Sequence, residues 1–393
     1  MIFFKAFQTH YWLRILFSAF ALSTVGSGLT FVVVFAELIA LQASPSSLAL
    51  AFVLSTVPGI FGTFFGSRFL RKFDAAFCIL LTEFLSLVGL IVPLLGVVWH
   101  NMVLLQMAEL VSSIVGGFAI PAMSHYMKVK LHDNELAAGS LMSTLVFGCH
   151  VLLGVGLGVC IYPWVNNPYV FLLIDGLSYG LSIGILMLLP KLYTGYSEVK
   201  IESLPIKLSL IQKISLNLLP LLASVGSPAM ALLPALIPSA MNPKETALPI
   251  LFARSLGQLV GPVFIRESHL KKPPMTLIAL CMVGFLVCYQ TVTLSTWFLL
   301  SFCLIFFAHI LSNIVANLGN YGLLKYFNSE HVAAASINSY RKQLTVMAIT
   351  GSLAGLLADY IGGQKALLIC SGVGLLLSIL VLFWLQRTDI NEE

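Results

Sequence analysis

Long apolar runs, separated by short polar or proline-containing stretches, occupy almost the whole chain. An α-helix needs roughly 20 apolar residues to cross the hydrocarbon core of a bilayer, and each run is about that long. The pattern therefore predicts an all-α membrane protein with about twelve transmembrane helices. The expected spans lie at residues 13–41, 47–67, 75–99, 102–124, 137–162, 169–190, 210–240, 246–265, 274–292, 296–324, 332–358 and 365–386.

The runs divide into two halves with a similar plan. Each half places a basic loop after its second run, at residues 67–74 and at residues 266–272. Internal repeats of this kind are typical of transporters that are built from two helix bundles. We expect a six-helix bundle at residues 1–190, a cytoplasmic linker at 191–209 and a second six-helix bundle at 210–393.

Composition and charge support a membrane protein and exclude several other classes. Hydrophobic residues make up 59% of the chain and charged residues only 9%, whereas an ordinary soluble domain carries about 25% charged residues. The net charge is +5, but the basic residues are scattered between apolar runs, so we expect the lipid bilayer and not nucleic acid as a partner. The seven cysteines fall inside apolar runs without a CxxC pair, which indicates small buried side chains.

The basic residues also predict an orientation. With the N-terminus inside, only Lys244 and Lys365 of the 21 lysines and arginines lie in loops on the outer side, and Arg254, Arg341 and Lys342 lie within spans. Cytoplasmic loops carry an excess of such residues. We therefore expect a multi-pass protein of a bacterial inner membrane with both termini in the cytoplasm.

Catalytic motifs are absent from the sequence. There is no HExxH motif, no phosphate-binding loop and no Cys/His cluster with metal-ligand spacing. The GLSYG string at residues 176–180 matches the nucleophile pattern of serine hydrolases, but that pattern needs a strand and a tight turn, not a membrane helix. We expect neither an enzyme nor a bound cofactor.

Three passages carry a family resemblance. They are FLLIDGLSY at residues 171–179, the stretch from NLLP at 217–220 to LP at 233–234, and GSLAGLLAD at residues 351–359. Together they resemble the major facilitator superfamily, and within it the drug:proton antiporters that include macrolide efflux pumps and the enterobactin exporter. The resemblance extends over essentially the whole chain and implies two bundles that transport a small molecule by alternating access. It also implies that Asp175 is a structural hydrogen-bonding anchor.

The resemblance further implies a cytoplasmic latch after the second span. The family pattern there is similar to GxLADRxxRK, and residues 62–72 keep its basic positions, whereas Ser67 stands in place of the aspartate and Ser336 in place of its arginine partner. Loss of both charges leaves two neutral groups and no stranded ion. Asp74 is a candidate substitute, so the expected latch residues are Arg68, Arg71, Lys72 and Asp74.

Three carboxylates inside the spans are candidates for proton coupling, since an ionisable group in a membrane helix is costly unless it serves a function or has a partner. Glu109 shares a helix stripe with Gln106 and Ser113 and is the first candidate, and Glu37 and Glu83 are the others. An internal ion pair is the alternative for Glu109. For Glu37 the alternative is contact with lipid headgroups.

Polar residues of the second half are candidates for substrate binding. His309, Asn313 and Asn317 recur every four residues, which places them on one stripe of a helix. The resemblance puts this stripe on the substrate path, and hydrogen bonding between helices is the alternative. Arg254 cannot lose its charge and must meet a carboxylate, carbonyl groups or an anionic substrate, and Arg341 lies about nine residues into its span.

Three functions remain open. The first is a monomeric, proton-coupled exporter of an amphipathic organic molecule. The second, suggested by Arg254, Arg341 and Lys342, is a transporter of a siderophore or other organic anion in either direction. The third is a membrane sensor or assembly factor that has a transporter fold but moves no solute. The missing latch charges favour this third function.

Overall fold

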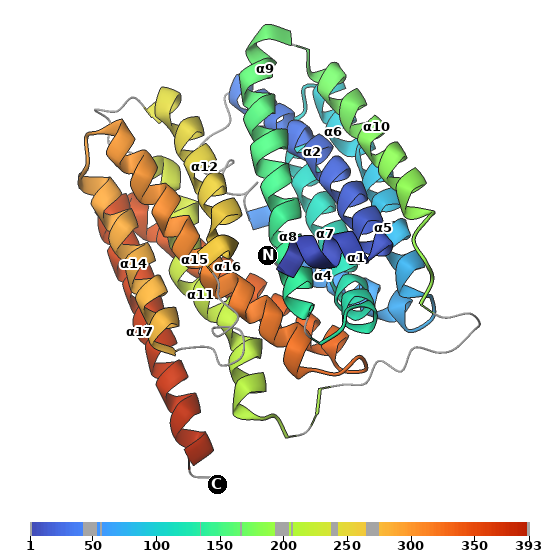
Figure 1. Ribbon diagram of the computed structural model, residues 1–393. Coiled ribbons are helices and arrows are strands. Elements are labelled where there is room, and N and C mark those ends of the chain that lie inside the picture. The colour runs from blue at the N-terminus through green and yellow to red at the C-terminus, as the bar shows by residue number, and fades with distance from the viewer. Residues whose placement is uncertain are drawn as a thin grey trace. The chain divides into compact units, whose positions relative to one another are not determined.

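The computed structural model describes residues 2–41, 53–55, 57–133, 135–165, 167–192, 204–205, 207–236, 243–264 and 275–390. Within these residues every regular element is a helix (Figure 1). The elements are α1 (Ile2–Thr9), α2 (Tyr11–Ala40), α4 (Gly59–Leu70), α5 (Ala75–Gly89), α6 (Ile91–Val98), α7 (Met102–Lys130), α8 (Leu136–Cys149), the π-helix η1 (His150–Gly156), α9 (Leu157–Val165), α10 (Pro168–Leu186), α11 (Leu210–Leu236), α12 (Pro243–Val260), the 3₁₀-helix η3 (Gly261–Phe264), α14 (Met275–Leu294), α15 (Phe298–Tyr326), α16 (Val332–Ile361) and α17 (Gly363–Ile390).

Ten helical stretches of the described residues are long and apolar enough to cross a membrane. They correspond to ten of the predicted spans, so the chain is an all-α, multi-pass membrane protein. The other two predicted spans correspond to α4, which has 12 residues, and α12, which contains Lys244, Glu245 and Arg254. The start of the predicted span at 47–67 lies outside the described residues.

Two predicted spans have internal irregularities that the apolar pattern does not reveal. The span at 75–99 consists of two helices, because the α5 geometry ends at Gly89 and α6 begins at Ile91. The span at 137–162 contains the π-helix η1 between α8 and α9. Hydropathy measures apolar length only, so it cannot distinguish a continuous α-helix from one that is interrupted in this way.

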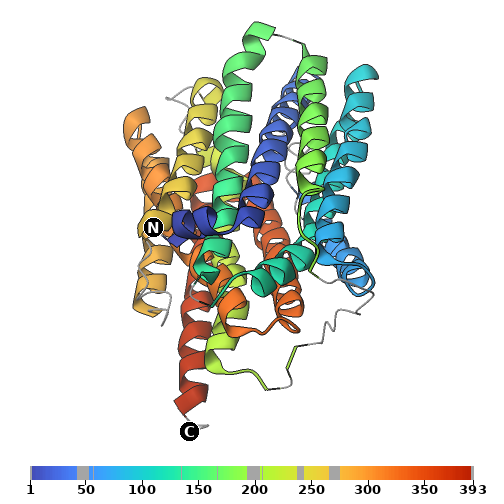
Figure 2. The same cartoon turned by 45° about the vertical axis from the view of Figure 1, so that its right-hand side comes forward.

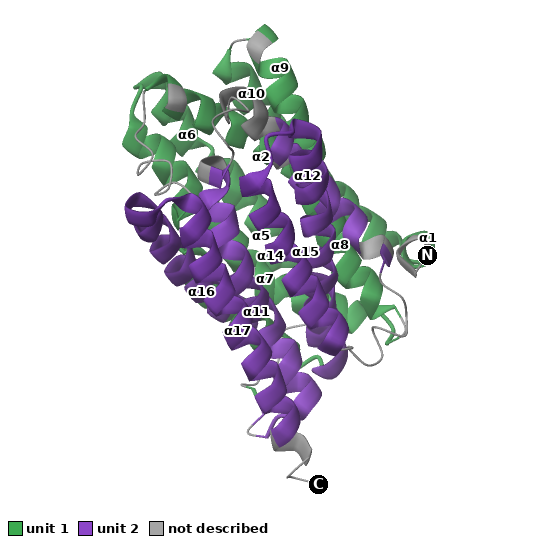
Figure 3. Ribbon diagram, turned by 90° about the vertical axis from the view of Figure 1, so that its left-hand side faces the viewer, with its two compact units in different colours: residues 1–204, 328–337 green, residues 205–327, 338–393 purple. Residues whose placement is uncertain are grey.

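The chain forms two compact units, which Figure 3 shows in green and purple. Unit 1 comprises residues 1–204 and 328–337, and unit 2 comprises residues 205–327 and 338–393. The first residues of α16 thus belong to unit 1, and the rest of this helix belongs to unit 2. The predicted linker at 191–209 lies mostly outside the described residues.

Unit 1 is arranged around α2 and α7. Helix α2 packs against α10 and η1, and α7 packs against α4, α5 and α6, as the blue to green ribbons of Figures 1 and 2 show. In both views the short helix α1 lies at a steep angle to α2. An apolar cluster that includes Leu38, Val97 and Phe171 joins α2, α6 and α10.

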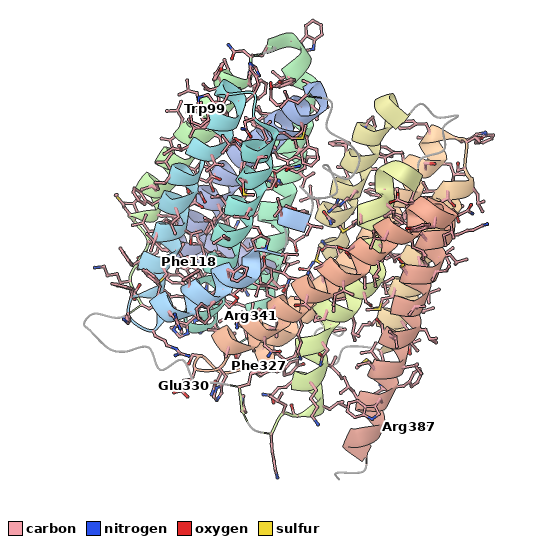
Figure 4. The ribbon with its side chains drawn as sticks, turned by 180° about the vertical axis from the view of Figure 1, so that it is seen from behind. Trp99, Phe118, Phe327, Glu330, Arg341 and Arg387 are labelled. Atoms are coloured by element: carbon pink, nitrogen blue, oxygen red, sulfur yellow. The ribbon has the colours of Figure 1, made fainter. Side chains whose placement is uncertain are left out.

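Side-chain caps fix the starts of three helices in unit 1. Asn101 accepts hydrogen bonds from the backbone N–H groups of Val103 and Leu104 at 2.9 and 3.1 Å, and so begins α7. Asn167 begins α10 in the same way, and Asp74 begins α5. Such caps satisfy donors that have no partner within the helix. Trp99 follows α6, is 63% exposed and lies close to the start of α7 (Figure 4). An exposed tryptophan near a helix end is typical of the membrane interface.

Glycines allow helix backbones to touch at two places in unit 1. A Cβ atom on Gly117 of α7 would collide with the Gly59 carbonyl oxygen of α4, and one on Gly62 would collide with the Ile114 carbonyl oxygen of α7. Small residues are common at such close approaches in membranes. The adjacent Gly116 is exposed, and a Cβ atom added there would have no neighbour within 4 Å.

Unit 2 is arranged around α11 and α15. Helix α11 packs against α15 and α17, and α15 also packs against α12 and α14. Hydroxyl groups stabilise the α11–α17 contact, since the Ser371 hydroxyl donates to the Val225 carbonyl at 2.7 Å and the Ser224 and Ser378 hydroxyl oxygens lie 3.1 Å apart. Such hydrogen bonds between helices contribute about 0.6 kcal/mol each in membrane proteins.

A side-chain hydrogen bond joins the end of α1 to the start of α8. His10 Nε2 lies 2.8 Å from Glu135 Oε2, and the His132 backbone N–H donates to the same oxygen at 3.3 Å. Burial acts to raise the pKa of Glu135, but these hydrogen bonds and the charges of His10 and His132 outweigh it and leave the pKa below the ordinary value of 4.5. The carboxylate is therefore stabilised in the folded protein.

We expect Glu135→Gln to lower stability by less than about 1 kcal/mol at neutral pH, because the pair is close to the surface. Since the folded pKa is lowered, the contribution is fully present above about pH 4.5 and is lost as the pH falls through the folded pKa. Thermal unfolding of the wild type and the variant should thus converge in acid. A difference that grows as the pH falls would contradict this assignment.

Candidate functional site

Two predicted proton-coupling residues, Glu109 and Glu37, lie in different surroundings in unit 1. Glu109 is buried on α7 and accepts no hydrogen bond from any residue that the structure describes. Gln106 and Ser113 are buried on the same stripe, and the Ser113 hydroxyl accepts from the Gly59 N–H at 2.9 Å. Glu37 is partly buried near the end of α2 and accepts a hydrogen bond from the Tyr162 hydroxyl at 3.2 Å.

Glu83, the third predicted coupling residue, lies in a buried polar cluster. It is 3% exposed on α5 and lies beside the hydroxyls of Ser23 on α2 and Ser182 on α10. Asp175 on α10 is fully buried and close enough to Glu83 for their charges to interact. The sequence thus identified both carboxyls but not their proximity.

Two hydroxyl groups bind the Asp175 carboxyl. The Thr30 hydroxyl of α2 donates to Oδ2 at 2.5 Å. The Ser178 hydroxyl lies 2.8 Å from the Asp175 carbonyl oxygen and 3.4 Å from Oδ1. A Cβ atom on Gly26 would collide with both the Ser178 hydroxyl and Asp175 Oδ1, so this glycine lets α2 approach the carboxyl. These contacts agree with the anchor role that the family resemblance implies for Asp175.

His150 begins the π-helix and faces α2. Its Nδ1 lies 2.9 Å from the Thr24 carbonyl oxygen and 3.2 Å from the Ser27 hydroxyl. A carbonyl oxygen can only accept, so Nδ1 carries a proton. One turn further along, a Cβ atom on Gly154 would collide with the backbone of α2 at Gly28, and π-turns of this kind frequently occur at functional sites.

A second polar cluster lies in unit 2, where α12, α14 and α15 meet. His309 Nε2 of α15 and the Tyr289 hydroxyl of α14 are 2.8 Å apart, and both side chains are buried. Arg254 of α12 is close enough to both for its charge to affect them. Gly257, which has no side chain, lets α12 pack closely against α15 at this point. A Cβ atom on Gly257 would collide with the Phe306 carbonyl oxygen.

Arg254 has no ion pair with any described residue of unit 2. Asp359 is the one carboxylate whose side chain the structure describes in this unit, and it is exposed near the end of α16. One turn after Arg254, Gln258 carries a buried side-chain oxygen that accepts no hydrogen bond from the described residues. Within the described part of unit 2, Arg254 and Gln258 thus present a cation and an amide oxygen that lack an ion-pair or hydrogen-bond partner.

The other predicted substrate-binding residues of α15, Asn313 and Asn317, are hydrogen-bonded to each other. The Asn317 side-chain amide donates to the Asn313 carbonyl oxygen at 2.9 Å and also contacts Asn313 Oδ1. Both asparagines are buried. These hydrogen bonds lie within one helix, whereas His309 on the same stripe makes the kind of contact between helices that the alternative describes. A role of the stripe in substrate binding stays a prediction.

Arg341 and Lys342 lie on α16, and Figure 4 labels the first of them. Helix α16 begins at Val332, so the two residues lie about as deep as the sequence predicted. Lys342 is exposed, and its Nζ lies 3.4 Å from the Asn217 side-chain oxygen of α11. A common role of Arg341 and Arg254 in substrate binding stays a prediction.

The predicted latch residues lie at the end of α4 and the start of α5. The Arg68 guanidinium carbon is 4.0 Å from the Phe64 ring centroid, and Arg71 and Lys72 are exposed. Asp74 Oδ1 caps α5 through the Ala76 N–H at 2.8 Å, and its Oδ2 accepts from the Leu192 N–H at 2.9 Å. These contacts make Asp74 a structural residue, and a latch role for the group stays a prediction.

A contact that the sequence did not suggest joins α7 to the segment before α16. His125 Nδ1 of α7 lies 2.8 Å from the Ser329 carbonyl oxygen, and both residues belong to unit 1. The neighbouring Tyr126 hydroxyl donates to the Pro190 carbonyl at 2.8 Å. No sequence signal marks these bonds, because the acceptors are backbone carbonyls that any residue could supply.

Sequence comparison gives little information about the family. No family model matches the chain. One curated protein, an uncharacterized 29.9 kDa protein in the crtE 3′ region of Pseudescherichia vulneris, is 36% identical over 67 residues. The match covers 17% of this chain and 25% of that protein's length.

Comparison of the structure with solved structures is informative about the fold. A bacterial homologue of the iron transporter ferroportin in its outward-facing state has a TM-score of 0.72 at 14% identity, over 96% of this chain and 100% of that chain. The human organic anion transporter MFSD10 has a TM-score of 0.63 at 12% identity, over 94% of this chain and 99% of that chain. The chain therefore has the same fold as these transporters, as predicted, and its membership of the major facilitator superfamily stays a prediction. The narrower group of macrolide pumps and the enterobactin exporter stays a prediction.

Proposed function

We propose that this protein is a proton-coupled secondary transporter that exports an amphipathic organic molecule with an acidic group. The observation that carries the proposal is the position of Arg254. A cation inside a membrane protein needs a partner, and the described part of unit 2 offers Arg254 none. An acidic group of the cargo would supply that partner through paired N–H donors, and Gln258, Tyr289 and His309 would contribute hydrogen bonds beside it.

The proposed mechanism is alternating access. The bundles at 1–190 and 210–393 would expose the site to one side of a bacterial inner membrane at a time, with both termini in the cytoplasm. MFSD10 is an organic anion transporter, which accords with cargo of this type. The ferroportin homologue is related to an iron transporter, which accords with transport in general. Asn313, Asn317 and Arg341 complete the proposed substrate-binding set.

Glu109 is the proposed main proton carrier, with Glu37 and Glu83 as further candidates. A buried carboxyl without a hydrogen-bond donor, such as Glu109, is more stable when it holds a proton than when it is charged. We expect Glu109→Gln to abolish uphill transport driven by a pH gradient, because the amide cannot release a proton, and to leave cargo exchange in place. Glu135→Gln, outside the spans, is the control. Unchanged uphill transport in Glu109→Gln would remove this residue from the role.

Purified protein in liposomes tests the proposal as a whole. An imposed pH gradient should drive accumulation of at least one labelled organic anion from a panel of siderophores and amphipathic carboxylates. Neutral and cationic drugs in the same panel test the choice of an acidic cargo. Flux of these drugs alone would refute the assignment of Arg254, and no gradient-driven flux with any compound would favour a sensor over a transporter.

A further inference from the structure

A group of positive charges lies in unit 1 where α4 ends and α5 begins. Arg68 belongs to the last turn of α4, Arg71 caps this helix with helical backbone angles, and Lys72 follows it. Arg68 is therefore three and four positions before the other two, which places the three residues on one side of the helix end. All three are exposed. None of them forms an ion pair with a residue that the structure describes.

The carboxylate nearest to these cations in the sequence is already engaged. Asp74 accepts hydrogen bonds from the Ala76 and Leu192 backbone N–H groups at 2.8 and 2.9 Å. The second bond also brings the exposed Lys191 to the start of α5. Ser67 of α4 has no charge, and its hydroxyl donates to a backbone carbonyl of the same helix. Residues 68–74 and Lys191 thus carry four cations and one carboxylate.

Exposed phenylalanine rings run beside these charges. The Phe69 and Phe73 rings are stacked with centroids 5.6 Å apart, and the Phe73 and Phe77 centroids are 5.3 Å apart. The three side chains are 38%, 44% and 43% exposed. Phe69 also packs against the buried Phe118 of α7, with centroids 5.5 Å apart (Figure 4). Phe69, Phe73 and Phe77 therefore form a phenylalanine ladder, a continuous apolar surface that α7 holds in place.

The phenylalanine ladder lies near one boundary of the bilayer. The stretch Ala75–Val98 is apolar enough to cross a membrane, and its 24 residues rise about 36 Å at 1.5 Å per residue. The hydrocarbon core is about 30 Å thick, so both ends of the stretch reach the headgroups. Trp99 stands at the far end (Figure 4). At the near end the ladder lies beside the outer hydrocarbon, and Arg71 and Lys72 lie at the depth of the headgroups.

We propose that the end of α4 and the start of α5 bind one anionic phospholipid. Its phosphate group lies among Arg71, Lys72 and Lys191, and one of its acyl chains covers the phenylalanine ladder. The Arg68 guanidinium carbon is 4.0 Å from the Phe64 ring centroid. A guanidinium over a ring keeps the N–H donors at its edge, which suit phosphate oxygens. The inference is independent of the proposed transport, since it concerns another surface and another ligand.

A lipid fits this surface better than a soluble anion does, because a free phosphate meets the cations and leaves the rings uncovered. Net negative charge also matters. A zwitterionic lipid carries its own cation next to the phosphate, whereas an anionic lipid leaves the attraction of the basic residues unopposed. Each lysine or arginine near an anionic membrane surface strengthens binding about fivefold. Several such residues at one helix end therefore favour an anionic lipid over a zwitterionic one.

Native mass spectrometry of the full-length protein in detergent tests the proposal. Phosphatidylglycerol and phosphatidylcholine with the same acyl chains are added together, and the retained lipid molecules are counted. The wild type should bind one phosphatidylglycerol about tenfold or more in preference to phosphatidylcholine. Arg71→Gln combined with Lys72→Gln should abolish this preference. Phe73→Ser should weaken retention of phosphatidylglycerol, because the acyl chain loses part of the ladder.

A second double variant is the matched control. Lys128→Gln combined with Lys130→Gln removes the same charge from the end of α7, which the bond from the Tyr126 hydroxyl to the Pro190 carbonyl places near Lys191. This variant should keep the preference for phosphatidylglycerol. Equal losses in the two double variants would show that total charge alone attracts the lipid and would refute a specific site.

The wild type alone gives a further test that needs no variant. Washing in about 1 M salt, where charges are screened beyond roughly 3 Å, should release phosphatidylglycerol before the mass measurement. Retention that salt leaves unchanged, or equal retention of the two lipids, would contradict the proposal. Displacement of the bound lipid by inorganic phosphate would identify a site for a soluble anion and would also overturn it.

Discussion

Gly117→Ala should destabilise the protein markedly, although alanine is the better helix former. A Cβ at Gly117 would collide with the Gly59 carbonyl oxygen and lie 2.8 Å from the carbonyl carbon. Both contacts are with backbone, so α4 and α7 must move apart to relieve them. Overpacking of this kind costs about 1–3 kcal/mol, and we expect the thermal unfolding midpoint in detergent to fall by several degrees.

The adjacent Gly116 provides a matched control for this prediction. A Cβ at Gly116 meets nothing within 4 Å, and alanine is favoured over glycine in a helix by about 1 kcal/mol. Gly116→Ala should therefore leave the midpoint unchanged or raise it. Equal effects of the two substitutions would show that helix propensity, and not the α4–α7 approach, determines the result.

Arg254→Met should have the largest effect on function, because it should lower transport strongly. It should leave stability unchanged or raise it. The substitution removes the cation that we propose binds the acidic group of the cargo, so transport of the anion should fall by tenfold or more. A charge in the protein interior without a partner is costly, and an apolar side chain of similar length removes that cost. The unfolding midpoint without cargo should therefore stay the same or rise, while the stabilisation that the anion gives to the wild type should disappear.

Lys342→Met is the control for the loss of one positive charge from unit 2. Lys342 is exposed and contacts Asn217 at 3.4 Å, so its removal should change transport of the anion much less. Arg254→Lys tests geometry, because lysine keeps the charge but cannot form the paired hydrogen bonds of a guanidinium. Wild-type transport by Arg254→Met would refute the proposed site. A clear loss of stability would indicate instead that Arg254 has a structural anion as its partner.

The fold was largely predictable because lipid imposes a simple rule on sequence. A chain that crosses a bilayer must satisfy its backbone hydrogen bonds within helices, so apolar length alone located the ten spans. The break at Leu90 and the π-helix at His150 escaped this reasoning, since both lie within apolar runs. The close approach at Gly117 also escaped it, because neighbouring glycines look alike until the facing helix is known.

The candidate sites were predictable as residues but not as groups. Glu83, Asp175 and Arg254 stand out because charge is rare in apolar runs. Their neighbours do not, since a tyrosine such as Tyr289 in an apolar run reads as part of the core. Which residues meet depends on the rotation and the order of packing of several helices, and a single sequence contains no measure of either.

Helix α12 imposes a condition on how the protein enters the membrane. It was not among the ten stretches that are apolar enough to cross on their own, and Arg254 alone would cost about 2.5–3.5 kcal/mol near the centre of a lone inserting helix. The ribosome delivers α12 before α14 and α15, and α15 packs beside it in the finished unit. We therefore expect α12 to enter the bilayer less readily on its own than the ten apolar stretches do, and more readily once later helices can shield its charge from lipid.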